Sequence, residues 1–413
     1  MNNKVLLKNM VALTLVQFSN YLAPLLVLPY LSRVLGTDGF GMIMMSLSLC
    51  SIGFIITDYG FNLSASYWIA KNAQNRDKVS KYIGAVYVIK YLLIFLFIIG
   101  LVIYSFISNS LLASQHTLIV LILLVVLFQS FQPMWFFQGI EKLKNVTIYM
   151  VVSKLSYLLL VWLLVKKETD TSFVLVSLCV SNFIATVISI YSIYKEGYKI
   201  TKPALYLIKH VFHSSSGFFL ARASVSVYTS ASTLIVGSYA GLHQAAMYSS
   251  AEKLYMAGQS LSSPVSQALY PYLARTGNSK ALLKIMAVLV PAFVIGCVVV
   301  SFISADFIRI FYGEGFEDSI RIFNIFLLSL VVTFVSINFG YPAFAALGKL
   351  RWANVTVFIG GGLQILLLVI LYCKNMITGV NVAICVLVTE STVLICRGIL
   401  LYAFKKRVRK NVS

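Results

Sequence analysis

Apolar runs of about twenty residues recur along the whole chain, and as a helix each is long enough to cross the roughly 30 Å hydrocarbon core of a bilayer. The alternating pattern of an outer-membrane barrel is absent, and in lipid a helix satisfies its own backbone hydrogen bonds. The sequence therefore predicts an all-α integral membrane protein. Its twelve transmembrane helices are expected at residues 11–31, 41–67, 82–106, 117–137, 146–165, 171–194, 214–236, 247–270, 282–304, 320–340, 352–372 and 379–402.

Composition argues against a soluble domain and against an enzyme. Charged residues make up only 11% of the chain, whereas an ordinary soluble domain is about a quarter charged. The loops between the predicted helices are too short for a catalytic domain or a nucleotide-binding loop. We expect no catalytic residues, no metal and no cofactor, because the histidines show no ligand spacing; they are His116, His210, His213 and His243.

The net charge of +20 is a topology signal rather than a sign of nucleic-acid binding. Basic residues crowd one set of alternate loops, and the other set holds only Arg33, Lys166, Lys167, Arg309 and Lys374. Cytoplasmic loops carry the excess of Lys and Arg in membrane proteins. The sequence therefore predicts a multi-pass protein with both termini in the cytoplasm and no nucleic-acid partner.

Three short matches at one offset indicate a tandem duplication. Gly36-Thr37-Asp38-Gly39 reappears as a related segment at 241, Trp68-Ile69-Ala70-Lys71 at 272, and Lys142-Leu143-Lys144 at 349. Six helices per half bring both halves into the membrane in the same orientation, as in transporters built from parallel repeats. We expect two six-helix lobes at 1–194 and 214–413, related by a pseudo-twofold axis along the membrane normal, with 195–213 as a cytoplasmic linker.

Polar side chains concentrate in four of the predicted helices, the first two of each half. The alternative explanation is tight helix packing through small residues, but it explains the charged residues less well. We therefore expect these helices to line a water-filled cavity. The polar residues are Thr14, Gln17, Asn20, Ser48, Ser51, Asp58, Asn62, Arg222, Ser226, Thr229, Ser230, Thr233, Gly237, Glu252, Lys253, Gln259, Ser263 and Ser266.

Charges inside the membrane mark functional sites, because each is costly unless paired or hydrated. Four cations qualify, namely Arg222, Lys253, Lys90 and Lys154. The two latter lysines have an alternative, which is to extend to the membrane surface. Three carboxylates are candidates for ion coupling or charge pairing, namely Asp58, Glu252 and Glu390, and Asp58 is placed to pair with Arg222. Arg321 and Arg397 lie close to helix ends, where anchoring at the membrane interface is expected.

Helix breakers fall in the same polar helices. Pro24 and Pro29 interrupt the first predicted helix, and Gly258 and Pro264 the eighth. Proline removes an intrahelical hydrogen bond and kinks a helix. These four residues are candidate hinges for alternating access, with static kinks as the alternative.

Two segments carry a family resemblance. Asn-Tyr-Leu-Ala-Pro-Leu-Leu at 20–26, followed by Pro-Tyr-Leu-Ser-Arg-Val-Leu-Gly at 29–36, resembles the opening of bacterial Wzx-type O-antigen flippases. Pro-Met-Trp-Phe-Phe-Gln-Gly-Ile-Glu at 133–141 looks like a second signature of that family. The resemblance implies the fold of the multidrug/oligosaccharidyl-lipid/polysaccharide exporter superfamily, with a cavity between two lobes, in the bacterial inner membrane.

By this resemblance, the cargo is an oligosaccharide linked to undecaprenyl pyrophosphate, moved from the cytoplasmic to the periplasmic leaflet for lipopolysaccharide or other polysaccharide biosynthesis. Arginine suits the bidentate binding of phosphate oxygens, so the four cations are candidates for holding the pyrophosphate. Membrane lipids and a polysaccharide polymerase and chain-length regulator are implied partners, and proton or sodium coupling is plausible. The rival functions are a drug or metabolite antiporter of the same superfamily and, from another class, a membrane-embedded polysaccharide polymerase or ligase.

Overall fold

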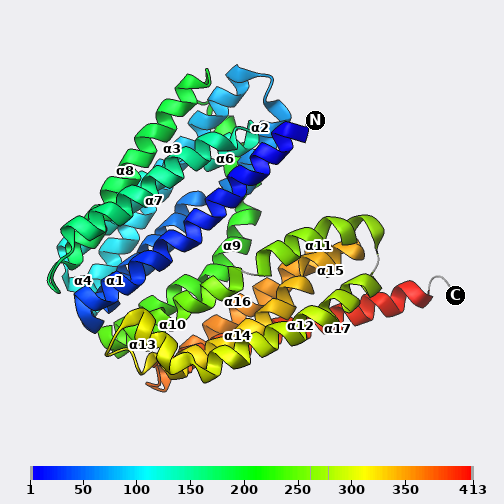
Figure 1. The fold of residues 1–413 in the computed structure, drawn as a ribbon. Coiled ribbons are helices and arrows are strands. Elements are labelled where there is room, and N and C mark those ends of the chain that lie inside the picture. The colour runs from blue at the N-terminus through cyan, green and yellow to red at the C-terminus, as the bar shows by residue number, and fades with distance from the viewer. Residues whose placement is uncertain (1–2, 261, 278, 411–413) are drawn as a thin grey trace. The chain divides into compact units, whose positions relative to one another are not determined.

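The computed structural model describes residues 3–260, 262–277 and 279–410, and every regular element in these ranges is a helix (Figure 1). Contacts divide the chain into two compact units, Met1–Ser226 and Val227–Ser413. The division falls inside one helix, whereas the sequence places a linker at 195–213. The predicted lobe boundaries were based on sequence repeats, whereas this division is based on contacts. The lobe boundaries therefore stay a prediction.

The first unit holds eight helices and the start of a ninth. They are α1 (Asn3–Asp58), α2 (Phe61–Asn72), α3 (Arg76–Ile107), α4 (Leu111–Ser114), α5 (His116–Ser130), α6 (Met134–Gly139), α7 (Leu143–Leu164), α8 (Thr171–Lys195) and α9 (Leu205–Ala240). In Figure 1 the long helices α1, α7 and α8 run alongside one another, and α7 packs against both of the others.

The second unit begins within α9 and continues with eight helices. They are α10 (Leu242–Ser260), α11 (Ser262–Thr276), α12 (Ser279–Phe302), α13 (Ser304–Tyr312), α14 (Ser319–Asn338), α15 (Tyr341–Ala346), α16 (Leu350–Cys373) and α17 (Gly379–Lys410). Helix α14 is central, because it packs against α10, α12 and α17.

Nine helical stretches in the described part of the chain are long and apolar enough to cross a membrane. One of them, Leu25–Asn72, is 48 residues long and contains the second predicted span and part of the first. The described parts of α9 to α11, which carry polar stripes, are not among these stretches. The protein is therefore a multi-pass helical membrane protein, and the count of twelve spans stays a prediction.

The second unit repeats the helix pairing of the first. Helix α5 packs on α8 as α14 packs on α17, α7 on α8 as α16 on α17, and α2 on α6 as α11 on α15. The backbone repeats too, since Gly36 and Gly241 have φ of 64° and 92°, and Glu141 and Gly348 have φ of 58° and 65°. The matches lie at the same offset as the sequence matches, and the duplication itself stays a prediction.

The second family-like segment of the sequence lies at the centre of the first unit. It folds as α6, and Trp135, Phe136 and Phe137 are buried there with Tyr82 and Tyr149 in one aromatic core. Edge-to-face ring pairs, such as Phe136 with Phe137 at 5.0 Å between centroids, fill the space, and such pairs stabilise beyond the area they bury. The segment is therefore a packing motif.

Candidate functional site: a charged cluster of α1, α2, α3 and α9

Asp58 ends α1 at a left-handed turn that requires glycine at position 60. Tyr59 and Gly60 have φ of 45° and 79° before α2 begins. A Cβ on Gly60 would lie 2.6 Å from the Phe218 Cβ, closer than real Cβ atoms approach, and 3.0 Å from the Phe219 backbone nitrogen. The turn therefore sits directly on the backbone of α9.

Two further contacts fix the turn against α9. The Tyr59 ring stacks on Phe212 and Phe219, with centroids 4.7 and 4.8 Å apart. The hydroxyls of Ser64 and Ser215 lie 2.7 Å apart, within hydrogen-bonding distance. This docking brings Asp58 and the side chains of α9 together, although they are far apart in the sequence.

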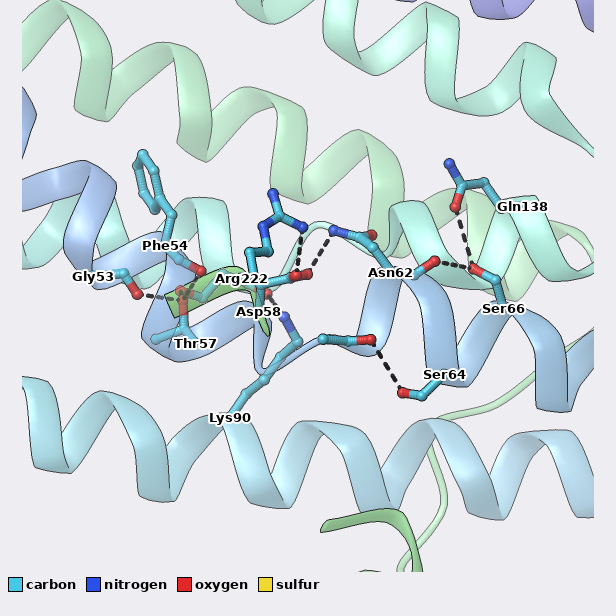
Figure 2. A network of polar contacts seen from close by, with 12 residues as sticks. Gly53, Phe54, Thr57, Asp58, Asn62, Ser64, Ser66, Lys90, Gln138 and Arg222 are labelled. Atoms are coloured by element: carbon cyan, nitrogen blue, oxygen red, sulfur yellow. Dashed lines mark hydrogen bonds and ion pairs between the residues drawn. The ribbon is translucent and has the colours of Figure 1, made fainter. Parts of the chain in front are cut away.

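Arg222 on α9 pairs with Asp58, as Figure 2 shows. The arginine Nη1 donates to Asp58 Oδ2 at 2.9 Å, and Asn62 Nδ2 donates to Asp58 Oδ1 at 2.6 Å. The Arg222 side chain is 53% exposed and that of Asp58 only 14%. Asp58 therefore holds one edge of the guanidinium, and among the described residues Nη2 and Nε have no other partner.

Lys90 of α3 enters the cluster from the core side. Its side chain is buried, and Nζ donates to the Ser130 carbonyl at 2.6 Å. Ser130 is the last residue of α5, where carbonyls lack an intrahelical partner and the helix end carries partial negative charge. The Ser130 hydroxyl in turn donates to Thr57 Oγ1 at 2.8 Å. Lys90 thus caps α5 and ties it to α3, while the Ser130 hydroxyl ties α5 to α1. The Lys90 ammonium is buried and does not extend to a membrane surface.

A cavity of about 140 Å³ opens within this cluster. Asp58, Asn62, Lys90, Arg222 and Tyr149 are among the residues that line it. Among the described groups, Asn62 Oδ1 and the Tyr149 hydroxyl are buried there with no hydrogen-bond partner. A polar cavity of this size has room for several water molecules, which would satisfy such groups.

The remaining predicted cations lie elsewhere. Lys154 is half-buried on α7 of the first unit, and Lys253 is half-buried on α10 of the second. Because Arg222 and Lys253 belong to different units, the shared cavity expected for them stays a prediction. Glu252, beside Lys253, is buried and accepts a hydrogen bond from the Thr233 hydroxyl at 2.8 Å.

The second unit has a buried charge cluster of its own, and it corrects one expectation. Arg397 was expected to anchor at the membrane interface, but it is only 6% exposed. It donates to the Ser336 carbonyl at 2.6 Å, to the Ser336 hydroxyl at 2.8 Å and to Thr356 Oγ1 at 3.1 Å. Glu390, about two helix turns away on α17, is also buried. The expectation was wrong because position along a helix says nothing about which face points inward.

The candidate hinges lie in different local settings. The non-helical break in α1 is at Gly36, with φ 64° and ψ −176°, and not at Pro29. Pro24 lies in α1 among residues whose side chains are outside the described part. Pro264 lies in the first turn of α11, and a Cβ on Gly258 would meet Leu330 at 2.6 Å. Gly258 thus allows close packing, and the four hinge roles stay predictions.

Sequence reasoning missed the residues that complete the site. Tyr149, Ser130 and Gln132 reach the cavity from α7 and from the end of α5, and nothing in their spacing indicated this. Among the described residues, no group of three or more His, Cys, Asp or Glu side chains could hold a metal ion.

Comparisons with known proteins fit this architecture. Two curated proteins, both named "Putative O-antigen transporter", are similar to the chain. The one from Escherichia coli (strain K12) is 28% identical over 80% of this chain and 82% of its own length. The one from Shigella dysenteriae is 31% identical over 65% of this chain and 67% of its own length.

Solved structures with the same fold are transporters. The lipid II flippase MurJ, in an inward closed conformation, matches 97% of this chain and 87% of its own with a TM-score of 0.72 at 14% identity. An inward-facing multidrug resistance MATE family transporter of the MOP superfamily matches 96% and 99% with a TM-score of 0.71 at 14% identity. The fold is thus that of the multidrug/oligosaccharidyl-lipid/polysaccharide (MOP) exporter superfamily. A sequence model of the polysaccharide biosynthesis protein family matches residues 6–277, and the chain belongs to that family.

Proposed function

We propose that the protein is a flippase that moves an oligosaccharide on undecaprenyl pyrophosphate from the cytoplasmic to the periplasmic leaflet of the bacterial inner membrane. The proposal includes twelve spans in two six-helix lobes, both termini in the cytoplasm, and ion-coupled alternating access. The O-antigen transporters among its relatives and the transporter fold support it. A polysaccharide polymerase and a chain-length regulator would act on the cargo after transport.

The observation that carries the proposal is the half-exposed Arg222 held by Asp58. A pyrophosphate needs a fixed cation with free donors, and a guanidinium can bind phosphate through two parallel hydrogen bonds. Asp58 engages Nη1 only, so the fork can be oriented and still bind an anion. In this account Arg222 binds the pyrophosphate, Asp58 and Lys90 position the cluster, and Lys253 and Lys154 are further cation candidates.

Charge variants test the role of Arg222 in cells that depend on this protein. Losing a charge-assisted contact of about 1.5–3 kcal/mol should weaken cargo binding by roughly tenfold to a hundredfold. Arg222→Ala should abolish surface polysaccharide while the protein still accumulates in the membrane, and Arg222→Lys should retain part of the activity. Arg309→Ala is the matched control, because Arg309 is also an exposed arginine with one carboxylate partner, Glu314, at 3.6 Å.

A purely structural pair predicts a different pattern. Arg222→Ala would then lower protein abundance, because Asp58 would be left without its counter-charge. The exchange Arg222→Asp with Asp58→Arg would restore function. Normal polysaccharide from a well-expressed Arg222→Ala variant would contradict both roles.

The second candidate function is a drug or metabolite antiporter, and the similarity of the fold to a MATE family transporter favours it. Such a transporter would favour carboxylates facing a cationic cargo, whereas here the exposed member of the Asp58–Arg222 pair is the cation. Resistance to cationic drugs on overexpression, with unchanged surface polysaccharide on deletion, would favour the antiporter.

Reporter fusions test the proposed topology. Fusions after Lys81 and after Ser413 should report the cytoplasm, and a fusion after His116 the periplasm, because the basic loops are expected inside. A periplasmic carboxyl terminus would overturn the even number of spans.

A further inference from the structure

The second unit contains a groove much larger than the charged cavity of the first. Its volume is about 1520 Å³, whereas sites for drug-sized ligands occupy roughly 300–1,000 Å³. Most of the lining residues come from α12, α14 and α17. The exposed apolar side chains of the lining are Val298, Phe302, Leu328 and Ile384.

The groove breaks the repeat between the two units. By element order α12 corresponds to α3, and in the most apolar stretch of α3 44% of the residues are buried. In α12 the share is 6%. Helix α3 packs against α1, α2, α4 and α5, while α12 has its main contacts with α11, α13, α14 and α15. Helix α12 is therefore much less covered than α3, and its exposed side chains line the groove.

Polar groups gather at one end of this groove. Arg321, Glu317 and Asp318 lie at the start of α14, beside Asn324 and Gln244. The Gln244 side chain is already engaged, because its Oε1 accepts from the Gly379 nitrogen at 3.1 Å. In the described part of the chain, Arg321 has no acidic partner within 4.0 Å.

The two carboxylates at this end are also accessible. The Asp318 side chain is 73% exposed, and its Oδ2 lies 3.4 Å from Nε2 of the His243 ring. Glu317 accepts from the Gly315 nitrogen through Oε1 at 3.2 Å, which leaves its second oxygen available. The end of the groove thus offers one unpaired cation next to two carboxylates.

We propose that this groove binds a zwitterionic phospholipid, with the phosphate at Arg321, the ammonium at Glu317 and Asp318, and an acyl chain along α14. The dimensions fit, because the lined stretch of α14 from Arg321 to Val332 is roughly 16 Å long at 1.5 Å per residue. One leaflet of a bilayer has a hydrocarbon depth of about 15 Å. The two carboxylates repel a purely anionic headgroup, so phosphatidylethanolamine is favoured over phosphatidylglycerol.

Native mass spectrometry of the full-length, delipidated protein tests the proposal with these two lipids as probes. Wild-type protein should bind phosphatidylethanolamine about tenfold more tightly than phosphatidylglycerol, and Arg321→Ala should lose about tenfold of that affinity, the size of one charge-assisted hydrogen bond. Glu317→Gln with Asp318→Asn should remove the preference between the two lipids.

A variant inside the groove and one outside it separate specific binding from the general lipid coat. Leu328→Trp narrows the groove along α14 and should weaken tight binding. Ile365→Trp is the matched control, because Ile365 is half-exposed on α16 and does not line the groove. Equal binding of both lipids by the wild type, unchanged binding by Leu328→Trp, or equal loss in the control would overturn the proposal. Because binding is measured without transport, the result is independent of the proposed cargo.

Discussion

Replacing Gly84 by alanine should destabilise the first unit. This glycine lets the extended segment 198–204, which we call the strap, lie directly on α3. A Cβ at position 84 would lie 1.8 Å from the Thr201 carbonyl oxygen and 3.0 Å from its carbon. Both are backbone atoms, so no side-chain rotation can relieve the overlap. The strap is held in place, since the Lys199 nitrogen donates to the Ser80 hydroxyl at 3.1 Å.

The change in the free energy of unfolding is the balance of a steric cost and a gain in helix propensity. If the strap stays in place, overpacking costs about 1–3 kcal/mol. If the strap lifts instead, it loses its packing and the Lys199–Ser80 hydrogen bond, about 1 kcal/mol. Alanine recovers up to about 1 kcal/mol over glycine in a helix. Gly100→Ala is the matched control on the same helix, because nothing lies within 4 Å of its added Cβ. It should gain the helix propensity alone. Both variants share that gain, so they should differ by the cost of overpacking, roughly 1–3 kcal/mol.

Unfolding rates of the purified variants in one detergent measure this difference, since heat unfolding of membrane proteins is commonly irreversible and is then governed by a rate. The expected order of resistance is Gly100→Ala, wild type, Gly84→Ala. The strap leads into α9, the helix that carries Arg222. Gly84→Ala should therefore also reduce transport, because the start of α9 would be held less firmly. If Gly84→Ala resisted unfolding as well as Gly100→Ala, the close approach of strap and helix would be refuted.

Three further predictions concern buried or paired charges. Lys90→Met should lower stability by about 1–3 kcal/mol, because the capped carbonyl of α5 loses its donor; the exposed Lys81→Met should show no comparable loss in thermal unfolding. Arg397→Met should cost about 3 kcal/mol or more, because several buried acceptors lose their partner, and a folded yield equal to wild type would contradict this. Partial burial raises the pKa of Glu196, but hydrogen bonds from Lys142 and an asparagine, with the lysine charge, outweigh it and hold the pKa below its usual 4.5. A carboxyl group whose pKa is lowered by folding stabilises the folded state above its unfolded pKa, and this contribution is lost as the pH falls. The Glu196→Gln variant should therefore lose less stability than the wild type below about pH 4.5, as measured by unfolding at a series of pH values.

Hydropathy predicted most of the helices because bilayer thickness sets their length. The tenth predicted span, 320–340, is α14 to within two residues, and the third, 82–106, lies inside α3. The second span, 41–67, was predicted as one helix but breaks at Tyr59 and Gly60. An apolar run does not reveal a left-handed turn that is required by packing against α9, which is distant in the sequence.

The site was predictable only in part, for a related reason. Intramembrane charges must be neutralised or hydrated, so Asp58 and Arg222 could be singled out and suggested as partners. The tight contact that joins them depends on Gly60 and on the rings of Tyr59, Phe212 and Phe219. Packing of this kind has no local sequence pattern.

The most direct test of the account is translocation in proteoliposomes. The purified protein is reconstituted with a labelled oligosaccharide on undecaprenyl pyrophosphate, and the label reaching the outer leaflet is detected with a membrane-impermeant reagent. We predict movement well above that in empty liposomes, abolished by Arg222→Ala and retained by Arg309→Ala. Movement no faster than in empty liposomes, or equal movement by wild type and Arg222→Ala, would contradict the central claim.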